Sequence, residues 1–376
     1  MVLMVRPIIS HIKMVNNMNF KDRILYLDIL RALAIIFVVF WHVSNQFSTN
    51  LLNFNVVIPI NSLVRIAIPI FLMISGALLI GQKKYDFLDF FKRRFSRIFI
   101  PHIFWVIIYF ILGLTIIPDY YGLFNYSTPA SLSISYFLAV FFSMSEFSAL
   151  LWFVWCIIGF YLIIPILNSF VKDYGLKGIE YILIMSILCL FIPTFGLKTS
   201  SISDRLRFIW PFFTCYFYPI LGYYIHNKKF NISNKMLMFI GFIVFVLGYC
   251  LSLNTMYFEG LADLSINYLD INHAFVVIES VGFFLMFKYM YMHSDKFKTA
   301  GESILSKLTV SLSEYSFGIY FIHMILIKFL LTKNWFVQFT IGKAYVWIPI
   351  FGFGILFVSW FVTFIMDKIP ILKLCK

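Results

Sequence analysis

Three ionisable residues lie inside the first long apolar stretch of the chain, residues 24–46. They are Asp28, Arg31 and His42, and the histidine follows the arginine by eleven positions. On a helix that turns about 100° per residue, Arg31 and His42 project within about 20° of each other, and Asp28 within about 60° of both. The pattern predicts one ionisable stripe on a membrane helix. Such a stripe marks a candidate functional site, because burying an ionisable group in hydrocarbon is costly without a partner or water.

The stripe offers two kinds of chemistry. A histidine accepts a proton from a hydroxyl group or attacks an acyl carbon itself, and an arginine binds phosphate through paired hydrogen bonds. A rise of about 1.5 Å per residue places His42 about 16 Å from Arg31 along the helix. We treat His42, Arg31 and Asp28 as candidate catalytic residues, with Asp28 orienting Arg31. Alternatively, Asp28 and Arg31 only form an ion pair where the helix starts, and His42 is a polar residue near the far interface.

Composition predicts that this helix belongs to an all-α polytopic membrane protein. Of the 376 residues, 61% are hydrophobic and 12% are charged, and the mean hydropathy is +0.90. Soluble globular domains do not have this composition, and continuous apolar runs of about twenty residues are typical of membrane helices rather than barrel strands. The weaker stretch 131–148 is expected to lie on, or dip into, the outer surface. We expect about ten spans, at 24–46, 56–80, 98–117, 149–171, 178–196, 208–226, 236–254, 271–291, 309–331 and 343–367.

Basic residues orient these spans. Twenty-two of the 30 Lys and Arg residues fall on the side of the N-terminus, and five fall on the opposite side. Cytoplasmic loops are enriched in positive charge, so we expect both termini in the cytoplasm and the chain in the plasma or inner cell membrane. Basic loops that face anionic lipid also account for most of the net charge of +13, so no nucleic-acid partner is expected.

The stretch before the first span is polar and irregular. We expect a poorly ordered extension over 1–19, a membrane domain over 20–368 and a short cytoplasmic tail over 369–376, and the chain could start at Met1 or at Met18. The five cysteines have no metal-ligand spacing, so we expect neither a disulfide framework nor a metal site.

The second span carries candidate substrate-binding residues. Arg65 lies inside it, Pro69 interrupts its hydrogen-bond ladder, and Ser75 precedes a glycine that permits close helix packing. An arginine beside a proline is compatible with a wet cavity in the membrane. A structural ion pair between Arg65 and Glu279, a charge inside the eighth span, is the alternative.

The first cytoplasmic loop reads KKYDFLDFFKRRFSRIFIP. Its apolar spacing predicts an amphipathic interfacial helix that leads into the third span. Arg93, Arg94 and Arg97 lie on or near one edge of that helix. Arginine forks suit phosphate, so these residues could hold the phosphates of a cytosolic cofactor. Anchoring at the cytoplasmic surface is the alternative.

The ninth span begins SLSEYSFGIYFIHMI and has two different faces. His323 projects within about 20° of Ser316, and Tyr320 within about 40° of Ser316. Glu314 projects to the opposite side, where we expect an ion pair with Lys328. We treat Tyr320 and His323 as candidate binding residues, although a lone membrane histidine is more often a hydrogen-bonded packing residue.

Five ordered stretches resemble the membrane-bound acyltransferase family 3. They read YLDILRALAIIFVVFWH, RIAIPIFLMISGALL, KRRFSRIFIP, LWFVWCIIGFYLIIPIL with FYPILGYYI, and SEYSFGIYFIHMILI. They occur in the family's order over about residues 20–368. The resemblance is closest to members that add O-acetyl groups to surface polysaccharides or their lipid-linked precursors. The chain departs from the pattern at His102, where an aromatic residue more often follows the proline, and we expect no additional SGNH-type domain.

The resemblance implies an O-acyltransferase with Arg31 and His42 as its essential pair. Its acyl donor would be cytosolic acetyl-CoA, used as a co-substrate without a metal, and its acceptor a glycan hydroxyl at the outer side. Membrane lipid, the glycan or lipid-linked glycan, and polysaccharide biosynthesis proteins are the expected partners. Two questions stay open: whether His42 is a general base or forms an acyl-imidazole, and whether the acyl group is acetyl or larger.

Two other functions fit the same composition. A transporter or exporter of a glycan or lipid-linked sugar could use the polar stripe as its path. A structural partner of a polysaccharide synthase would do no chemistry of its own. Only acyl transfer would consume labelled acetyl-CoA and leave an alkali-labile ester on a glycan.

Overall fold

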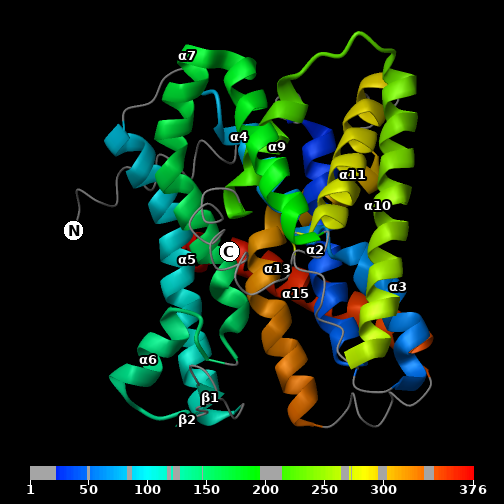
Figure 1. Ribbon diagram of the computed structural model, residues 1–376. Coiled ribbons are helices and arrows are strands. Elements are labelled where there is room, and N and C mark those ends of the chain that lie inside the picture. The colour runs from blue at the N-terminus through cyan, green and yellow to red at the C-terminus, as the bar shows by residue number, and fades with distance from the viewer. Residues whose placement is uncertain are drawn as a thin grey trace.

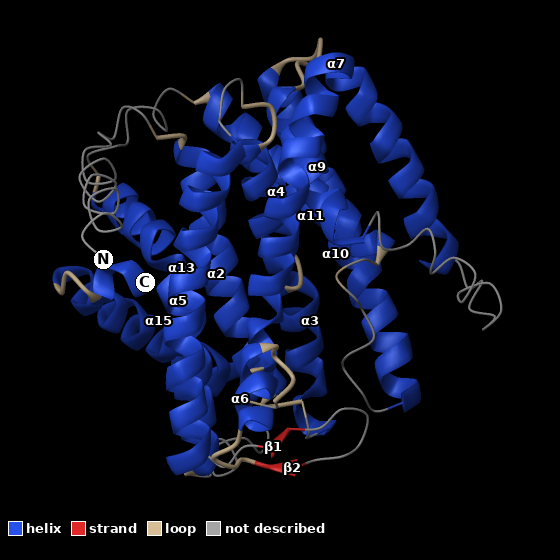
Figure 2. Cartoon of the chain, turned by 90° about the vertical axis from the view of Figure 1, so that its left-hand side faces the viewer, coloured by secondary structure: helices blue, strands red, loops and turns tan. Residues whose placement is uncertain are grey.

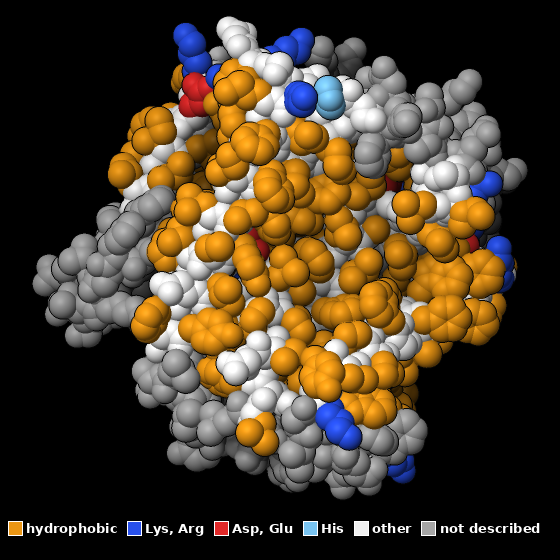
Figure 3. Space-filling view, turned by 90° about the vertical axis from the view of Figure 1, so that its right-hand side faces the viewer, with side chains coloured by type: hydrophobic (Ala, Val, Ile, Leu, Met, Phe, Trp, Pro, Cys, Tyr) orange, Lys and Arg blue, Asp and Glu red, His pale blue; other side chains and the backbone are white. Residues whose placement is uncertain are grey.

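Long apolar helices make up most of the computed structural model (Figure 1). Eight helices of the described residues are long and apolar enough to cross a membrane, so the expected all-α polytopic membrane fold is confirmed. Figure 3 shows that one broad face is almost entirely apolar, with Lys and Arg side chains near its margins. The structure describes residues 23–48, 51–82, 87–116, 120–121, 128–145, 147–194, 214–263, 271, 273–294, 303–333 and 343–376.

In the described part of the chain, ten α-helices contain apolar runs, and a few short elements lie between or after them. The long elements are α2 Leu25–Asn45, α3 Phe54–Val64, α4 Ala67–Leu79, α5 Phe87–Thr115, α7 Trp152–Thr194, α9 Thr214–Asn227, α10 Asn234–Asp263, α11 Ala274–His293, α13 Ile304–Thr332 and α15 Ala344–Lys368. The short ones are η2 Leu51–Asn53, α6 Ile134–Phe141, η3 Ala149–Leu151, η6 Leu372–Cys375 and the antiparallel pair β1 Tyr120–Tyr121 and β2 Thr128–Pro129.

Local backbone chemistry explains how these elements correspond to the expected spans. The second span is interrupted at Arg65–Ile66, because Pro69 has no N–H to offer the carbonyl of Arg65. The run α7 contains Gly175 at φ 59° and ψ −149°, a conformation that glycine tolerates. Its two halves meet there and correspond to the spans expected at 149–171 and 178–196 (Figure 2). The described part of the span at 208–226 is α9, which has 14 residues.

Helix α2 lies inside the bundle. It packs most closely against α13 and α4, and also against α15, α3 and α11. Its apolar side chains are buried on several sides, as expected for a helix that is hydrophobic around most of its circumference. This position surrounds the ionisable stripe with protein rather than lipid.

The surface segments agree only in part with expectation. Helix α5 runs without interruption from the basic loop into the third span, and α6 forms within 131–148, at the end of the molecule that also holds β1 and β2 (Figure 2). His102, the residue at which the sequence departs from the family pattern, links α5 to α6. Its Nε2 lies 3.3 Å from the carbonyl oxygen of Phe141, the last residue of α6. The segment 369–376 is attached to α5 at Cys375. This residue is buried, and its carbonyl oxygen accepts a hydrogen bond of 2.8 Å from the Trp105 indole.

Glycines allow two helix pairs to approach closely. A Cβ on Gly76 of α4 would lie 1.8 Å from the carbonyl oxygen of Pro219 in α9, and one on Gly222 would lie 2.1 Å from that of Met73. Helices α10 and α11 meet in the same way, where a Cβ on Gly248 would lie 2.4 Å from the backbone nitrogen of Glu279. Small residues at such crossings strengthen van der Waals packing in membranes.

Replacing Gly76 by alanine should weaken the fold. The added methyl group meets backbone atoms of α9 that have no rotamer to change, so we expect a loss of about 1–3 kcal/mol in unfolding free energy. Thermal unfolding of the detergent-extracted protein measures this. Gly354→Ala is the matched control, since nothing lies within 4 Å of its Cβ position. Equal unfolding midpoints for the two variants would contradict the close contact.

Candidate active site

The carboxylate of Asp28 has a partner that sequence reasoning did not assign to it. Arg23 Nε and Nη2 lie 3.0 Å from Asp28 Oδ2 and Oδ1, a bidentate pair at the start of α2. The same guanidinium reaches Glu314 of α13 at 2.5 Å. Ser313 Oγ donates to Asp28 Oδ1 at 2.6 Å. Arg23 is therefore the closest cation to Asp28, and Arg31 is a more distant one.

Arg31 keeps much of its charge uncompensated within the described residues. Its Nη1 is 4.0 Å from Asp28 Oδ1 and 3.4 Å from Ser313 Oγ, and its side chain is 28% exposed. A partly exposed guanidinium with one distant carboxylate is suited to bind an anion.

Two arginines of the basic loop join Arg31 around one tyrosine. The hydroxyl of Tyr161 in α7 interacts electrostatically with the positive charges of Arg94, Arg97 and Arg31. The positive charge of Arg97 also interacts with that of Arg31. Side chains of α2 and α5 thus lie within electrostatic range of one hydroxyl of α7, and we call Arg31, Arg94, Arg97 and Tyr161 the arginine cluster. Arg93 and Arg97 are both exposed on α5, whereas Arg94 is half-buried.

His42 lies at the opposite end of α2, next to aromatic rings. The His323 ring of α13 is 5.2 Å from it between centroids, and the Trp41 ring is 4.7 Å away, edge to face. His42 keeps some accessible surface although α2 is an interior helix, whereas His323 is fully buried. The candidate binding residue His323 therefore lies next to His42.

The hydroxyl groups predicted to line the site are engaged elsewhere. Tyr320 donates to the carbonyl oxygen of Leu150 in η3, and Ser316 donates to that of Ser313 at 2.8 Å. Ser75 donates to the carbonyl of Phe71 in its own helix at 2.9 Å. The Tyr320 hydroxyl thus bonds to another element, whereas those of Ser316 and Ser75 bond within their own helices.

Arg65 and Glu279 are not partners. The Arg65 guanidinium carbon lies 5.5 Å from the centroid of the Trp41 ring, a cation–π geometry, at the break between α3 and α4. Glu279 is fully buried and faces Ser252 and Tyr249 of α10, away from Arg65. The cation–π contact places Arg65 one ring away from His42.

The expected ion pair between Glu314 and Lys328 is also wrong. Glu314 binds Arg23 instead. The two residues are fourteen positions apart on α13, about 21 Å at a rise of 1.5 Å per residue, which is too far for contact. Glu314 and Lys328 do project to the same side of α13, but their separation along the helix axis excludes an ion pair.

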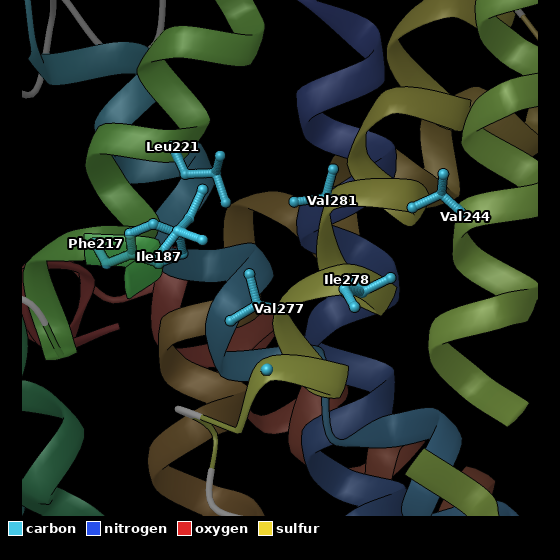
Figure 4. Close-up of a pocket in the computed structure, with 8 residues that line it drawn as sticks. Ile187, Phe217, Leu221, Val244, Val277, Ile278 and Val281 are labelled. Atoms are coloured by element: carbon cyan, nitrogen blue, oxygen red, sulfur yellow. The ribbon is translucent and has the colours of Figure 1, made fainter. Parts of the chain in front are cut away.

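An apolar cavity of about 180 Å³ lies away from these residues. Figure 4 shows it between the second half of α7, α9, α10 and α11, with Phe217, Leu221, Val277 and Val281 among its lining side chains. None of the predicted site residues lines it. We therefore assign the cavity to packing within the membrane and not to the candidate site.

Three contributors to the site escaped sequence reasoning. Ser313 had a usable signal, because it lies three residues before Ser316 on the same helix and so shares its face. Arg23 was recognised only as a basic flank of the first span. Tyr161 gave no signal, since its place beside Arg31 depends on how α7 packs.

One comparison with known proteins gives a match. The family model described as an acyltransferase domain, that of acyltransferase family 3, matches residues 24–364, which includes both ends of the stripe. No curated protein and no solved structure matches the chain.

The Arg23–Asp28 pair predicts an asymmetric response to mutation. Asp28→Asn leaves a largely buried guanidinium without its bidentate partner, and should cost about 1–3 kcal/mol in unfolding free energy. Glu314→Gln removes the other carboxylate, whose side chain is 48% exposed, and should cost less than about 1 kcal/mol. Thermal unfolding in detergent compares them. A larger loss in Glu314→Gln would show that Arg23 depends mainly on α13.

Proposed function

Because the chain belongs to acyltransferase family 3, a family of membrane acyltransferases, we propose that it moves an acetyl group from cytosolic acetyl-CoA to a hydroxyl of a cell-surface polysaccharide or its lipid-linked precursor. One observation carries the proposal. A single interior helix has an arginine cluster at one end and an accessible histidine at the other. The two ends lie about 16 Å apart by helix rise, so they can hold different parts of one extended donor.

The arginine cluster is suited to the phosphates of the donor. Its guanidinium groups come from Arg31, Arg94 and Arg97, and no carboxylate is among the charges that act on the Tyr161 hydroxyl between them. In the proposed orientation this end faces the cytoplasm, where acyl-CoA is made. The pantetheine chain would then extend along α2 and present the thioester near His42.

His42 is suited to the transfer step. Its imidazole takes the proton of the acceptor hydroxyl while the hydroxyl oxygen bonds to the thioester carbonyl carbon. The carbon–sulfur bond then breaks, and the departing thiolate takes the proton from the imidazolium. If His42 is instead the nucleophile, its ring nitrogen displaces the thiolate and an acyl-imidazolium forms; the acceptor hydroxyl oxygen then displaces the imidazole from the acyl group, and the hydroxyl proton passes to the thiolate.

Replacement of His42 by alanine is the direct test. We expect acyl transfer to fall by about 100-fold or more, because proton transfer or covalent catalysis is lost. The assay supplies labelled acetyl-CoA to membranes and measures alkali-labile label on glycan. Expression and unfolding temperature should stay near those of the wild type, since alanine fits an apolar helix. Transfer at the wild-type rate would remove His42 from the reaction, and no transfer by the wild type would favour a transporter.

The donor site predicts a graded response among the loop charges. Arg94→Glu and Arg97→Glu should each raise the KM for acetyl-CoA about 10- to 100-fold, because each removes a charge-assisted hydrogen bond to phosphate and adds repulsion. Arg93→Glu should have a smaller effect, because the loop arginines whose charges act on Tyr161 are Arg94 and Arg97. Lys92→Glu, an exposed residue of the same helix, is the control for net charge. Equal changes in all four variants would reduce the arginines to membrane anchors.

A further inference from the structure

The buried ring of His323 has one nitrogen engaged and one unengaged. Its Nδ1 lies 3.1 Å from the carbonyl oxygen of Ile319, one turn earlier in α13. A carbonyl only accepts, so Nδ1 carries the hydrogen, and Nε2 of the neutral ring is an acceptor. Nε2 is enclosed and has no hydrogen-bond partner among the described residues. A buried polar atom left in this state requires an explanation.

His42 is the ionisable neighbour of this acceptor. The two rings are 5.2 Å apart between centroids and inclined by 48°, and His323 is the titratable side chain whose charge acts on His42. The other titratable groups close to the pair are Tyr320 on α13, with Tyr109 of α5 and Cys156 of α7 beside it. All three are neutral in their ordinary state. Arg65 lies beyond Trp41.

We propose that His323 is a positioning residue whose Nε2 accepts the N–H of His42 during the reaction. The inference rests on the proposed function, in which His42 is the base or the nucleophile. Holding His42 through one nitrogen fixes its tautomer and leaves the lone pair of the other nitrogen for the substrate. The carboxylate of a serine-hydrolase triad does the same for its histidine. A neutral imidazole achieves this without burying a second charge in the membrane.

The proton inventory of the proposed step is balanced. When His42 takes the acceptor's proton it becomes an imidazolium with two N–H groups. One of them stays donated to Nε2 of His323, and the other returns its proton to the departing thiolate. His323 keeps its own proton on Nδ1 throughout, so it stays neutral.

Chemical modification tests the positioning role without an acceptor. Diethylpyrocarbonate reacts with the lone pair of a neutral imidazole, and mass spectrometry of peptides gives a rate for each histidine. His323→Leu keeps volume but removes the acceptor, whereas His323→Gln places an amide oxygen near the former Nε2. We expect the His42 rate to fall about 3- to 10-fold in the Leu variant and to stay within about twofold of wild type in the Gln variant. Exposed His293 is the internal reference.

Steady-state kinetics in membranes give a second readout. With labelled acetyl-CoA, kcat should fall about 10- to 100-fold in His323→Leu with KM unchanged, and His323→Gln should recover most of it. If the Leu variant does not extract as a monodisperse protein, His323→Met makes the same comparison. An unchanged His42 modification rate in the variant without an acceptor overturns the positioning role. Wild-type transfer by His42→Ala would instead overturn the proposed function.

Discussion

The bidentate pair between Arg23 and Asp28 determines what the first helix can do. It neutralises the carboxylate at the start of α2, and Glu314 of α13 ties the same guanidinium to the neighbouring helix. Without Arg23, the nearest cation to Asp28 would be Arg31, and the two charges would cancel. Because Arg23 takes that place, Arg31 keeps a positive charge one turn further along an interior helix. The arginine cluster depends on this division of partners.

The sequence predicted the elements better than the contacts between them. Apolar runs of sufficient length located the spans, and helical projection placed Asp28, Arg31 and His42 on one side of α2. Contacts that depend on helix packing could not be obtained in this way. Helical projection placed Glu314 opposite Ser316, but it could not show that Glu314 pairs with Arg23. Tyr161 interacts with Arg31 only because α7 packs beside α5. Hydroxyls at Ser316 and Tyr320 were found, but their backbone partners were not.

The two ends of the proposed site lie on one helix, α2, and this has a mechanical advantage. Residues on the same rigid element keep their separation when neighbouring helices move, so the distance from Arg31 to His42 is set by helix geometry alone. The partners come from other elements: Arg94 and Arg97 from α5 at one end, and His323 from α13 at the other. Movement of α5 relative to α13 could therefore change access while the central spacing is kept.

The buried Glu279 has a consequence for how the chain enters the bilayer. Helix α11 has the lowest hydropathy of the eight candidate spans, 1.5, and it would expose a carboxyl group to lipid if it inserted alone. In the folded protein that group faces Ser252 and Tyr249 of α10, along a seam kept narrow by Gly248. We therefore expect insertion to be more favourable when α10 and α11 leave the translocon together, because the more apolar helix offsets the cost of inserting the less apolar one.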